Sequence, residues 1–210
     1  MSRIAVIDFE TTGISPSAGD RVTEVAVVIL EQGRVVDRYQ SLMNAGVRIP
    51  SFITQLTGIT NDMVAGAPPA ERVMREAARF VGGLPMVAHN ASFDRRFWCS
   101  ELALAGQEAG HPFACTVLLS RRLYPEAPSH RLGTLVDHFQ LPRTGRAHRA
   151  LADAEMAAEL LGRIQHDLRA RHGVREPDHA FLMALQRCAR AALPKFMQAR
   201  ASGAVSSAAA

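Results

Sequence analysis

The stretch Arg3-Ile4-Ala5-Val6-Ile7-Asp8-Phe9-Glu10-Thr11-Thr12-Gly13 carries the fold prediction. An apolar run that ends in acids is typical of a buried strand whose carboxyl end opens onto a site. Side chains alternate between the two faces of a strand, so Asp8 and Glu10 point the same way. Two acids at the end of an apolar strand are costly unless they bind something. Read alone, however, such a pair is common and is more often an exposed strand end with solvated acids.

The segments that follow predict an α/β fold. Two β-branched runs are separated by Glu31-Gln32-Gly33, which indicates a hairpin, so the sheet begins with at least partly antiparallel strands. Later strands alternate with helical patterns, which predicts a mixed central sheet of about five strands flanked by helices. The expected strands are 3–9, 22–30, 34–42, 85–88 and 113–115. The expected helices are 52–56, 70–81, 92–105, 116–123, 132–139, 149–171 and 180–193, the last interrupted by Pro194.

Length and composition favour one main domain. The chain has 210 residues, enough for a single well-buried core. We expect the main domain over 1–172, a helical extension over 173–200 and a disordered tail over 201–210, which is mainly Ala and Ser. Three cysteines without a Cys-x-x-Cys pair argue against a disulfide framework and a thiolate zinc site. With no secretion signal or apolar span in the sequence, we expect a cytoplasmic protein and no membrane partner.

The net charge of +4 is unevenly distributed. Residues 1–130 carry 12 Arg and 13 acids, whereas residues 131–210 carry 11 Arg and one Lys against 7 acids. A basic C-terminal third is suited to holding a polyanion. Arginines that fill solvated helix faces explain the same asymmetry, so charge alone leaves both interpretations open.

Two further stretches carry groups of chemical interest. The first is His89-Asn90-Ala91-Ser92-Phe93-Asp94, at the end of an expected strand, and in isolation Asp94 is a helix-start acid. The second is His148 with Asp153, five residues later. On one helix this spacing separates the two side chains by about 140°. We therefore expect His148 on the loop before the helix, where it can accept a proton near neutral pH, and Asp153 on the first turns.

Together the three stretches supply four carboxylates and a histidine. Clustered carboxylates repel one another and become tolerable when divalent cations lie between them, which is the arrangement that a two-metal nuclease requires. In this combination the chain resembles the DEDDh 3′→5′ exonucleases, the group typified by the proofreading epsilon subunit of bacterial DNA polymerase III. Gln55-Leu56-Thr57-Gly58-Ile59 and His130-Arg131-Leu132-Gly133-Thr134-Leu135 are also similar to the family. The resemblance covers about residues 1–165, with no departure at an acidic or histidine position.

The resemblance implies a ribonuclease H-like fold, a hydrolase acting by a two-metal mechanism, and a set of site residues. The ligands of two Mg²⁺ or Mn²⁺ ions would be Asp8, Glu10, Asp94 and Asp153, and His148 would be the general base. The substrate-binding residues would be Thr11 and Thr12, whose backbone would meet the terminal 3′-hydroxyl, Leu56 and Phe93, which would pack against terminal bases, and His89 and Asn90. Arginines near the site, such as Arg149, would meet phosphate charge.

The resemblance also sets the alternatives. The leading hypothesis is an exonuclease that releases nucleoside monophosphates from single-stranded or frayed DNA ends, in replication or repair. An exoribonuclease that trims RNA 3′ ends is a second reading, since the motifs do not separate the two sugars. In a third, the chain is chiefly a polymerase-binding subunit that docks through residues 177–200. Packing of that segment on its own domain is the competing explanation.

Overall fold

The computed structural model describes residues 3–143, 145–146 and 148–202. Within this part of the chain, five strands form one mixed sheet in the order β3-β2-β1-β4-β5. The strands are β1 (Ile4–Thr11), β2 (Val22–Glu31), β3 (Arg34–Leu42), β4 (Met86–Ala88) and β5 (Phe113–Cys115). The predicted α/β fold with a mixed five-stranded sheet is confirmed, including the hairpin that joins β2 to β3.

The pairing of the strands sets where their carboxyl ends lie. β2 runs antiparallel to β1 and β3, whereas β4 is parallel to β1 and β5. Because β1 and β4 are parallel neighbours, the residues that leave both strands emerge at the same edge of the sheet. In the β1–β2 ladder, Glu10 lies opposite Glu24.

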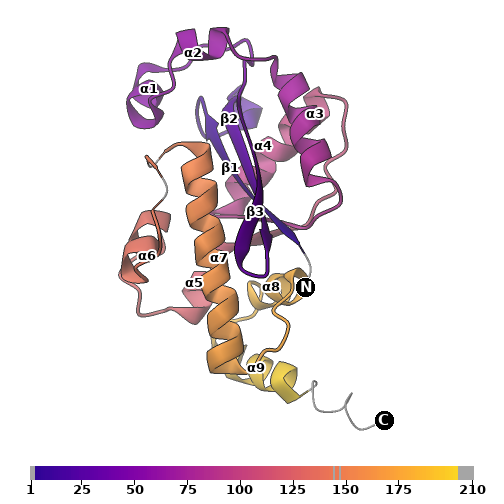
Figure 1. The fold of residues 1–210 in the computed structure, drawn as a ribbon, viewed down its shortest axis with the longest axis vertical. Coiled ribbons are helices and arrows are strands. Elements are labelled where there is room, and N and C mark those ends of the chain that lie inside the picture. Colours follow the sequence, from indigo (N-terminus) through magenta and orange to yellow (C-terminus); the bar gives the residue numbers. More distant parts are fainter. Residues whose placement is uncertain (1–2, 144, 147, 203–210) are drawn as a thin grey trace.

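The two faces of β1 bury separate cores. Ile4 and Val6 pack with α7 (Ala150–His172), whereas Ala5 and Ile7 pack with α3 (Ala70–Val81) and α4 (Ala91–Leu104). Figure 1 shows α7 running along the sheet, with α3 and α4 away from it. Asp8 and Glu10 continue the face of Ile4 and Val6, so strand periodicity places both acids on the α7 side.

The remaining helices complete the two layers. α5 and α6 pack beside α7, while α1 and α2 surround a small separate core of Ile49, Ile53, Ile59 and Val64. Their bounds are α1 (Ser51–Thr57), α2 (Asn61–Ala65), α5 (Thr116–Leu123) and α6 (Leu132–His138), and two short 3₁₀ turns are Pro16–Ala18 and Arg190–Ala192. The sequence patterns did not predict α2, a five-residue helix capped by the side chain of Thr60.

The expectation of one helical segment over 180–193 was wrong. The chain forms α8 (His179–Leu185) and α9 (Leu193–Ser202) instead. Asp178 caps α8 by accepting a hydrogen bond from the backbone N–H of Phe181 at 2.8 Å. Pro194 does not interrupt a helix, because it lies in the first turn of α9, where its missing N–H has no helical partner to lose.

The apolar residues of this extension face inward. Phe181, Leu182 and Leu185 are buried in the core beneath α7, and Leu193 and Phe196 pack against it. The segment therefore packs on its own domain, as the competing explanation predicted. α9 also extends into the segment expected to be disordered, and the rest of that prediction, residues 203–210, lies outside the described residues. Among the described helices, none is long and apolar enough to span a bilayer.

Candidate active site

Three distant segments bring four carboxylates to one end of the sheet. Asp8 and Glu10 lie at the carboxyl end of β1, and Asp94 lies in the first turn of α4, just after β4. Asp153 lies in the first turn of α7, on the side of the sheet that Asp8 and Glu10 face. Glu10, Asp94 and Asp153 are all close enough to Asp8 for their charges to act on it.

The acids are unfavourable as a cluster of free anions. Burial and the charges of Asp94, Asp153 and Glu10 raise the pKa of Asp8 well above its usual range. Burial and neighbouring acids raise the pKa of Glu10 to about 8. Burial also raises the pKa of Asp94 to about 8, and it raises the pKa of Asp153. A bound cation would reverse this effect by favouring the ionised form of every member.

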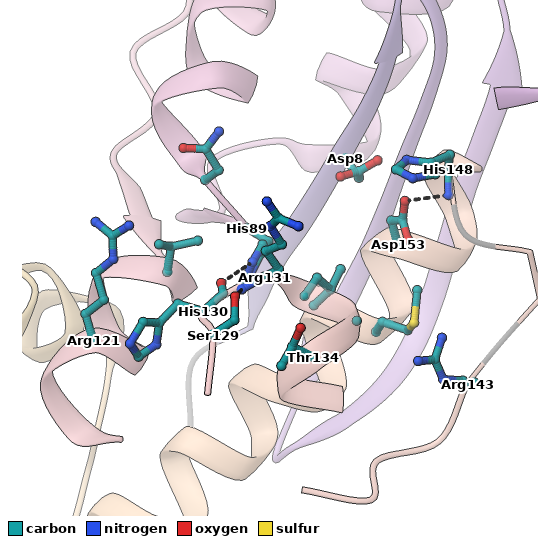
Figure 2. Close-up of a pocket in the computed structure, with 15 residues that line it drawn as sticks. Asp8, His89, Arg121, Ser129, His130, Arg131, Thr134, Arg143, His148 and Asp153 are labelled. Atoms are coloured by element: carbon teal, nitrogen blue, oxygen red, sulfur yellow. Dashed lines mark hydrogen bonds between the residues drawn. The ribbon is translucent and has the colours of Figure 1, made fainter. Parts of the chain in front are cut away.

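His148 lies on the loop before α7, as the five-residue spacing predicts. Its φ of +59° is in the left-handed region, which is uncommon for a residue with a side chain. The backbone N–H of His148 donates to the Asp153 carboxylate at 3.0 Å, which holds the loop in this conformation. Figure 2 shows the imidazole directed toward Asp8. Ligand atoms of Glu10, His148 and Asp153 lie within 4.8 Å of one another.

A fifth acid, Glu24, anchors this loop by binding Arg149 and Ala150, the two residues that follow His148. Glu24 is fully buried and accepts from Arg149 Nε at 3.0 Å, from Arg149 Nη2 at 2.7 Å and from the backbone N–H of Ala150 at 3.1 Å. Gln40 donates a further hydrogen bond at 2.7 Å. Burial raises the pKa of Glu24, but these donors outweigh it, so the pKa lies below its usual range. Arg149, expected to meet phosphate, is thus ion-paired with Glu24.

The turn after Glu10 is built for close packing. The Thr12 hydroxyl accepts from the backbone N–H of Arg21 at 3.0 Å, and the Thr11 hydroxyl donates to the carbonyl of Gly13 at 2.5 Å. A Cβ on Gly13 would lie 2.4 Å from the Asp20 carboxylate, so a larger residue there would have to displace the Asp20 side chain. Arg21 itself forms a two-point ion pair with the buried Glu101. The backbone of residues 11–13 is therefore held rigidly beside the acids.

His89 and Asn90 lie at the end of β4, next to the acids. The His89 ring is within 2.9 Å of the Thr116 hydroxyl and 3.1 Å of the His130 carbonyl oxygen, so both ring nitrogens have partners within the protein. Burial lowers the pKa of His89 to about 4, which keeps the ring neutral. Asn90 is exposed and precedes α4 in a left-handed conformation.

Two cavities meet at the acid cluster. Both are lined by Asp8, His89, Asn90, His148 and Asp153. The first, which we call the apolar lobe, has a volume of about 840 Å³ and lies between the 11–13 turn, α1 and α4. Its wall includes Ile14, Phe52, Ile53, Leu56 and Phe93.

Leu56 and Phe93 therefore both line the cavity next to the acids. Leu56 is 48% exposed, so it is not the core residue of α1 that its apolar character would suggest. Sequence reasoning missed Ile14 and Phe52, which are 77% and 64% exposed. The sequence does show large apolar residues on the loop after the first acids and on the next helix. Whether such side chains are exposed depends on tertiary structure, so the sequence alone does not place them in the cavity wall.

The second cavity, which we call the basic lobe, has a volume of about 880 Å³ and extends from the acids toward α5 and α6 (Figure 2). Its wall includes Arg121, His130, Arg131 and Arg143. In the sequence, the stretch from His130 to Leu135 shows only a family likeness, and Arg121 belongs to none of the motifs. The acids thus lie between an apolar and a basic surface.

The residues present fit divalent cations. The cluster offers carboxylate oxygens, the ligands that Mg²⁺ and Mn²⁺ prefer, together with one imidazole. Burial and mutual repulsion raise the pKa values of Asp8 and Glu10, so added positive charge would favour their ionised forms. A cation among them would supply that charge, whereas no described lysine or arginine donates to Asp8 or Asp94.

Comparisons with known proteins identify the family of the chain. The model of the exonuclease family matches residues 5–161. The chain is 40% identical over 168 residues to the 3′-5′ exonuclease DinG of Bacillus subtilis (strain 168), a match that covers 80% of this chain and 18% of that protein. It is 38% identical over 167 residues to a PolC-type DNA polymerase III of Halalkalibacterium halodurans, covering 79% of this chain and 12% of the polymerase. The chain therefore spans less than a fifth of these relatives.

Solved structures share the fold. Exonuclease X in complex with 5′ overhanging duplex DNA superposes with a TM-score of 0.65 at 30% identity, covering 78% of this chain and 91% of that one. The nuclease domain of 3′hExo, a DEDDh family member bound to rAMP, gives a TM-score of 0.68 at 20% identity, with 79% and 92% coverage. The ribonuclease H-like architecture is thereby confirmed. The chain belongs to the exonuclease family, whose model matches residues 5–161.

Proposed function

We propose that this chain is a metal-dependent 3′→5′ exonuclease that releases nucleoside 5′-monophosphates from single-stranded or frayed DNA ends. One observation carries the proposal: Asp8, Glu10, Asp94, Asp153 and His148 come from three distant segments and meet where two cavities join. DinG and Exonuclease X are both named as exonucleases, which supports the reaction type.

The four carboxylates would hold two Mg²⁺ or Mn²⁺ ions, and Asp8 is the member on which the charges of the other three act. When bound, the ions would activate the attacking water and stabilise the leaving 3′-oxygen. The chain itself supplies the geometry: Asp153 fixes the loop of His148 through the hydrogen bond from the His148 N–H. His148 would accept the proton of the attacking water as the bond from phosphorus to the 3′-oxygen breaks.

The apolar lobe would take the terminal nucleoside. Exposed Leu56 and half-buried Phe93 offer faces for a base, and the rigid backbone at Thr11 and Thr12 offers polar groups for the terminal 3′-hydroxyl. Asn90 would add a polar contact at the mouth. His89 would act by bracing the end of β4 against His130, since both of its ring nitrogens already have partners.

The test compares DNA and RNA strands of the same sequence, each labelled at the 5′ or at the 3′ end, in Mg²⁺. The proposal expects 5′-labelled DNA to shorten in single-nucleotide steps and 3′-labelled DNA to release labelled monophosphate at once. Faster degradation of RNA would shift the assignment to the exoribonuclease reading. Release of label from the 5′ end first, or internal cuts, would contradict the proposed direction.

Association with a polymerase remains the alternative role, because relatives include PolC-type polymerases that contain a matching region. The inward packing of Phe181, Leu182 and Leu185 gives this role no support from residues 177–200. Co-elution of the full chain with a polymerase catalytic subunit in size-exclusion chromatography would support it. Separate elution at micromolar concentration would count against it.

A further inference from the structure

The basic lobe contains positive charge that the proposed hydrolysis does not use. Arg121 projects from the last turns of α5, and Arg131 precedes α6. In Figure 2 the labelled side chains run from Asp8 and His148 past Arg131 to Arg121. The lobe is thus a continuous extension of the acid site.

Two of these arginines are available for a ligand. Arg121 and Arg131 are exposed, and within the described ranges neither guanidinium has an ion-pair partner. Arg143 differs, because its Nη2 and Nε bind the Asp137 carboxylate at 2.7 and 3.1 Å. Burial and the nearby charge of Arg121 lower the pKa of His130, which fits an excess of positive charge here.

The two lobes differ in the chemistry that they can accept. The wall of the apolar lobe carries Ile14, Phe52 and Leu56 with the acid Asp20, and its described lining includes no arginine or lysine. That surface suits a base and repels phosphate. A strand whose last nucleoside lies there would continue past the acids. Of the two lobes, the basic lobe is the one whose described lining carries arginines that can contact its phosphates.

We propose that Arg121 and Arg131 bind the phosphodiester backbone on the 5′ side of the scissile linkage. The two lobes then fix the direction in which a strand lies: terminal nucleoside against α1, upstream backbone along α5 and the start of α6. This inference rests on the proposed function for the placement of the 3′ end. Arg149 has no such role, since Glu24 holds its guanidinium.

The experiment compares two substrates of different length. One is the nitrophenyl ester of thymidine 5′-phosphate, which has no upstream phosphate, and the other is a single-stranded 12-mer. Arg121→Ala and Arg131→Ala are tested in the full chain, with Arg34→Ala as a control that removes one exposed arginine from the β2–β3 hairpin, far along the strands from the acids. Arg131→Lys keeps the charge and serves as the conservative variant.

We expect the ratio of kcat/KM for the 12-mer to that for the ester to fall about five- to ten-fold in each alanine variant, and to stay within two-fold in the Arg34 control. The dependence of 12-mer affinity on salt should weaken by about 0.7 in log–log slope for each lost contact. Arg131→Lys should retain most of the ratio. An unchanged ratio, or an equal loss on both substrates, would overturn the inference.

Binding keeps this test separate from the hydrolysis test. Fluorescence anisotropy of a labelled 12-mer, with Ca²⁺ in place of Mg²⁺, measures affinity without relying on turnover. If the wild-type chain cleaves neither substrate but its binding depends on Arg121 and Arg131, the proposed function fails and the backbone site stands. If the wild-type chain cleaves both and the alanine variants bind as tightly as wild type, the backbone site fails and the proposed function stands.

Discussion

The buried acid Glu24 allows a sharp test of how the site is held. In Glu24→Gln the side chain keeps its size but loses its charge, so the guanidinium of Arg149 loses its ionic partner. Both oxygens of Glu24 are engaged in the native protein, one by Arg149 Nη2 and Gln40 and the other by Arg149 Nε and the Ala150 N–H. An amide can accept at only one of these two positions, and its NH₂ group would face donors at the other.

The size of the effect follows from burial. Removing one partner of a buried ion pair typically costs about 3–5 kcal/mol. The Arg149 side chain is 34% exposed, however, so water can partly solvate the freed guanidinium. We therefore expect a loss of about 2 kcal/mol in the free energy of unfolding, which lowers the Tm by roughly 4–8 °C for a chain of this size.

Activity should fall as well, because Arg149 and Ala150 connect His148 to the first turn that carries Asp153. A displacement of about 1 Å in a catalytic group can cost roughly 100-fold in rate, so we expect kcat to fall about 10- to 100-fold. The assays are urea unfolding and hydrolysis of a 12-mer in Mg²⁺.

Glu155→Gln is the matched control, since Glu155 also joins α7 to the sheet through an arginine, Arg38. The Arg38 side chain is 51% exposed, so this pair should be worth less than about 1 kcal/mol. Equal losses in the two variants, or a Glu24→Gln protein with wild-type stability and rate, would show that Glu24 does not anchor the catalytic loop.

Two other perturbations test the cluster itself. Burial and neighbouring acids raise the pKa of Glu10 to about 8, and burial raises that of Asp94 to about 8. In EDTA the folded chain therefore retains protons that the unfolded chain releases above about pH 5. The Tm in EDTA should therefore fall by at least about 3 °C as pH rises from 5 to 8, and Mg²⁺ should remove most of that fall. A Tm in EDTA that is constant or rises with pH would contradict the unfavourable ionisation of these buried acids. His148→Ala should lower turnover by roughly 10²- to 10⁴-fold at unchanged Tm, and near-normal turnover at neutral pH would eliminate His148 as the general base.

Local sequence patterns predicted most of the sheet and the elements on which several of the candidate site residues lie. The apolar run that ends at Asp8 and Glu10 placed both acids on one face, because strand periodicity is a local property. The spacing of His148 and Asp153 predicted a loop followed by a helix for the same reason. α7 begins at Ala150, so His148 lies before the helix and Asp153 lies in its first turn, as the spacing predicted.

Features that depend on contacts between distant segments were not predictable. Glu24 stands in an otherwise apolar run, but its role depends on the register with β1 and on the arrival of α7 from 125 residues away. Arg149 was expected to meet phosphate, and only the tertiary structure shows that its charge is already paired. The break between α8 and α9 was missed because an apolar pattern does not show which carbonyls and N–H groups find partners.

The most direct measurement is the release of labelled nucleoside 5′-monophosphate from a 3′-labelled single-stranded DNA, by the wild-type chain and by Asp8→Ala, in Mg²⁺ and in EDTA. If these carboxylates form the site, the wild-type chain should release the nucleotide in Mg²⁺ but not in EDTA, and Asp8→Ala should release only background amounts. The Tm of Asp8→Ala in EDTA should equal or exceed that of wild type, because one repelling acid has been removed. Release that persists in EDTA, or in a folded Asp8→Ala protein, would contradict a hydrolytic site built on this cluster.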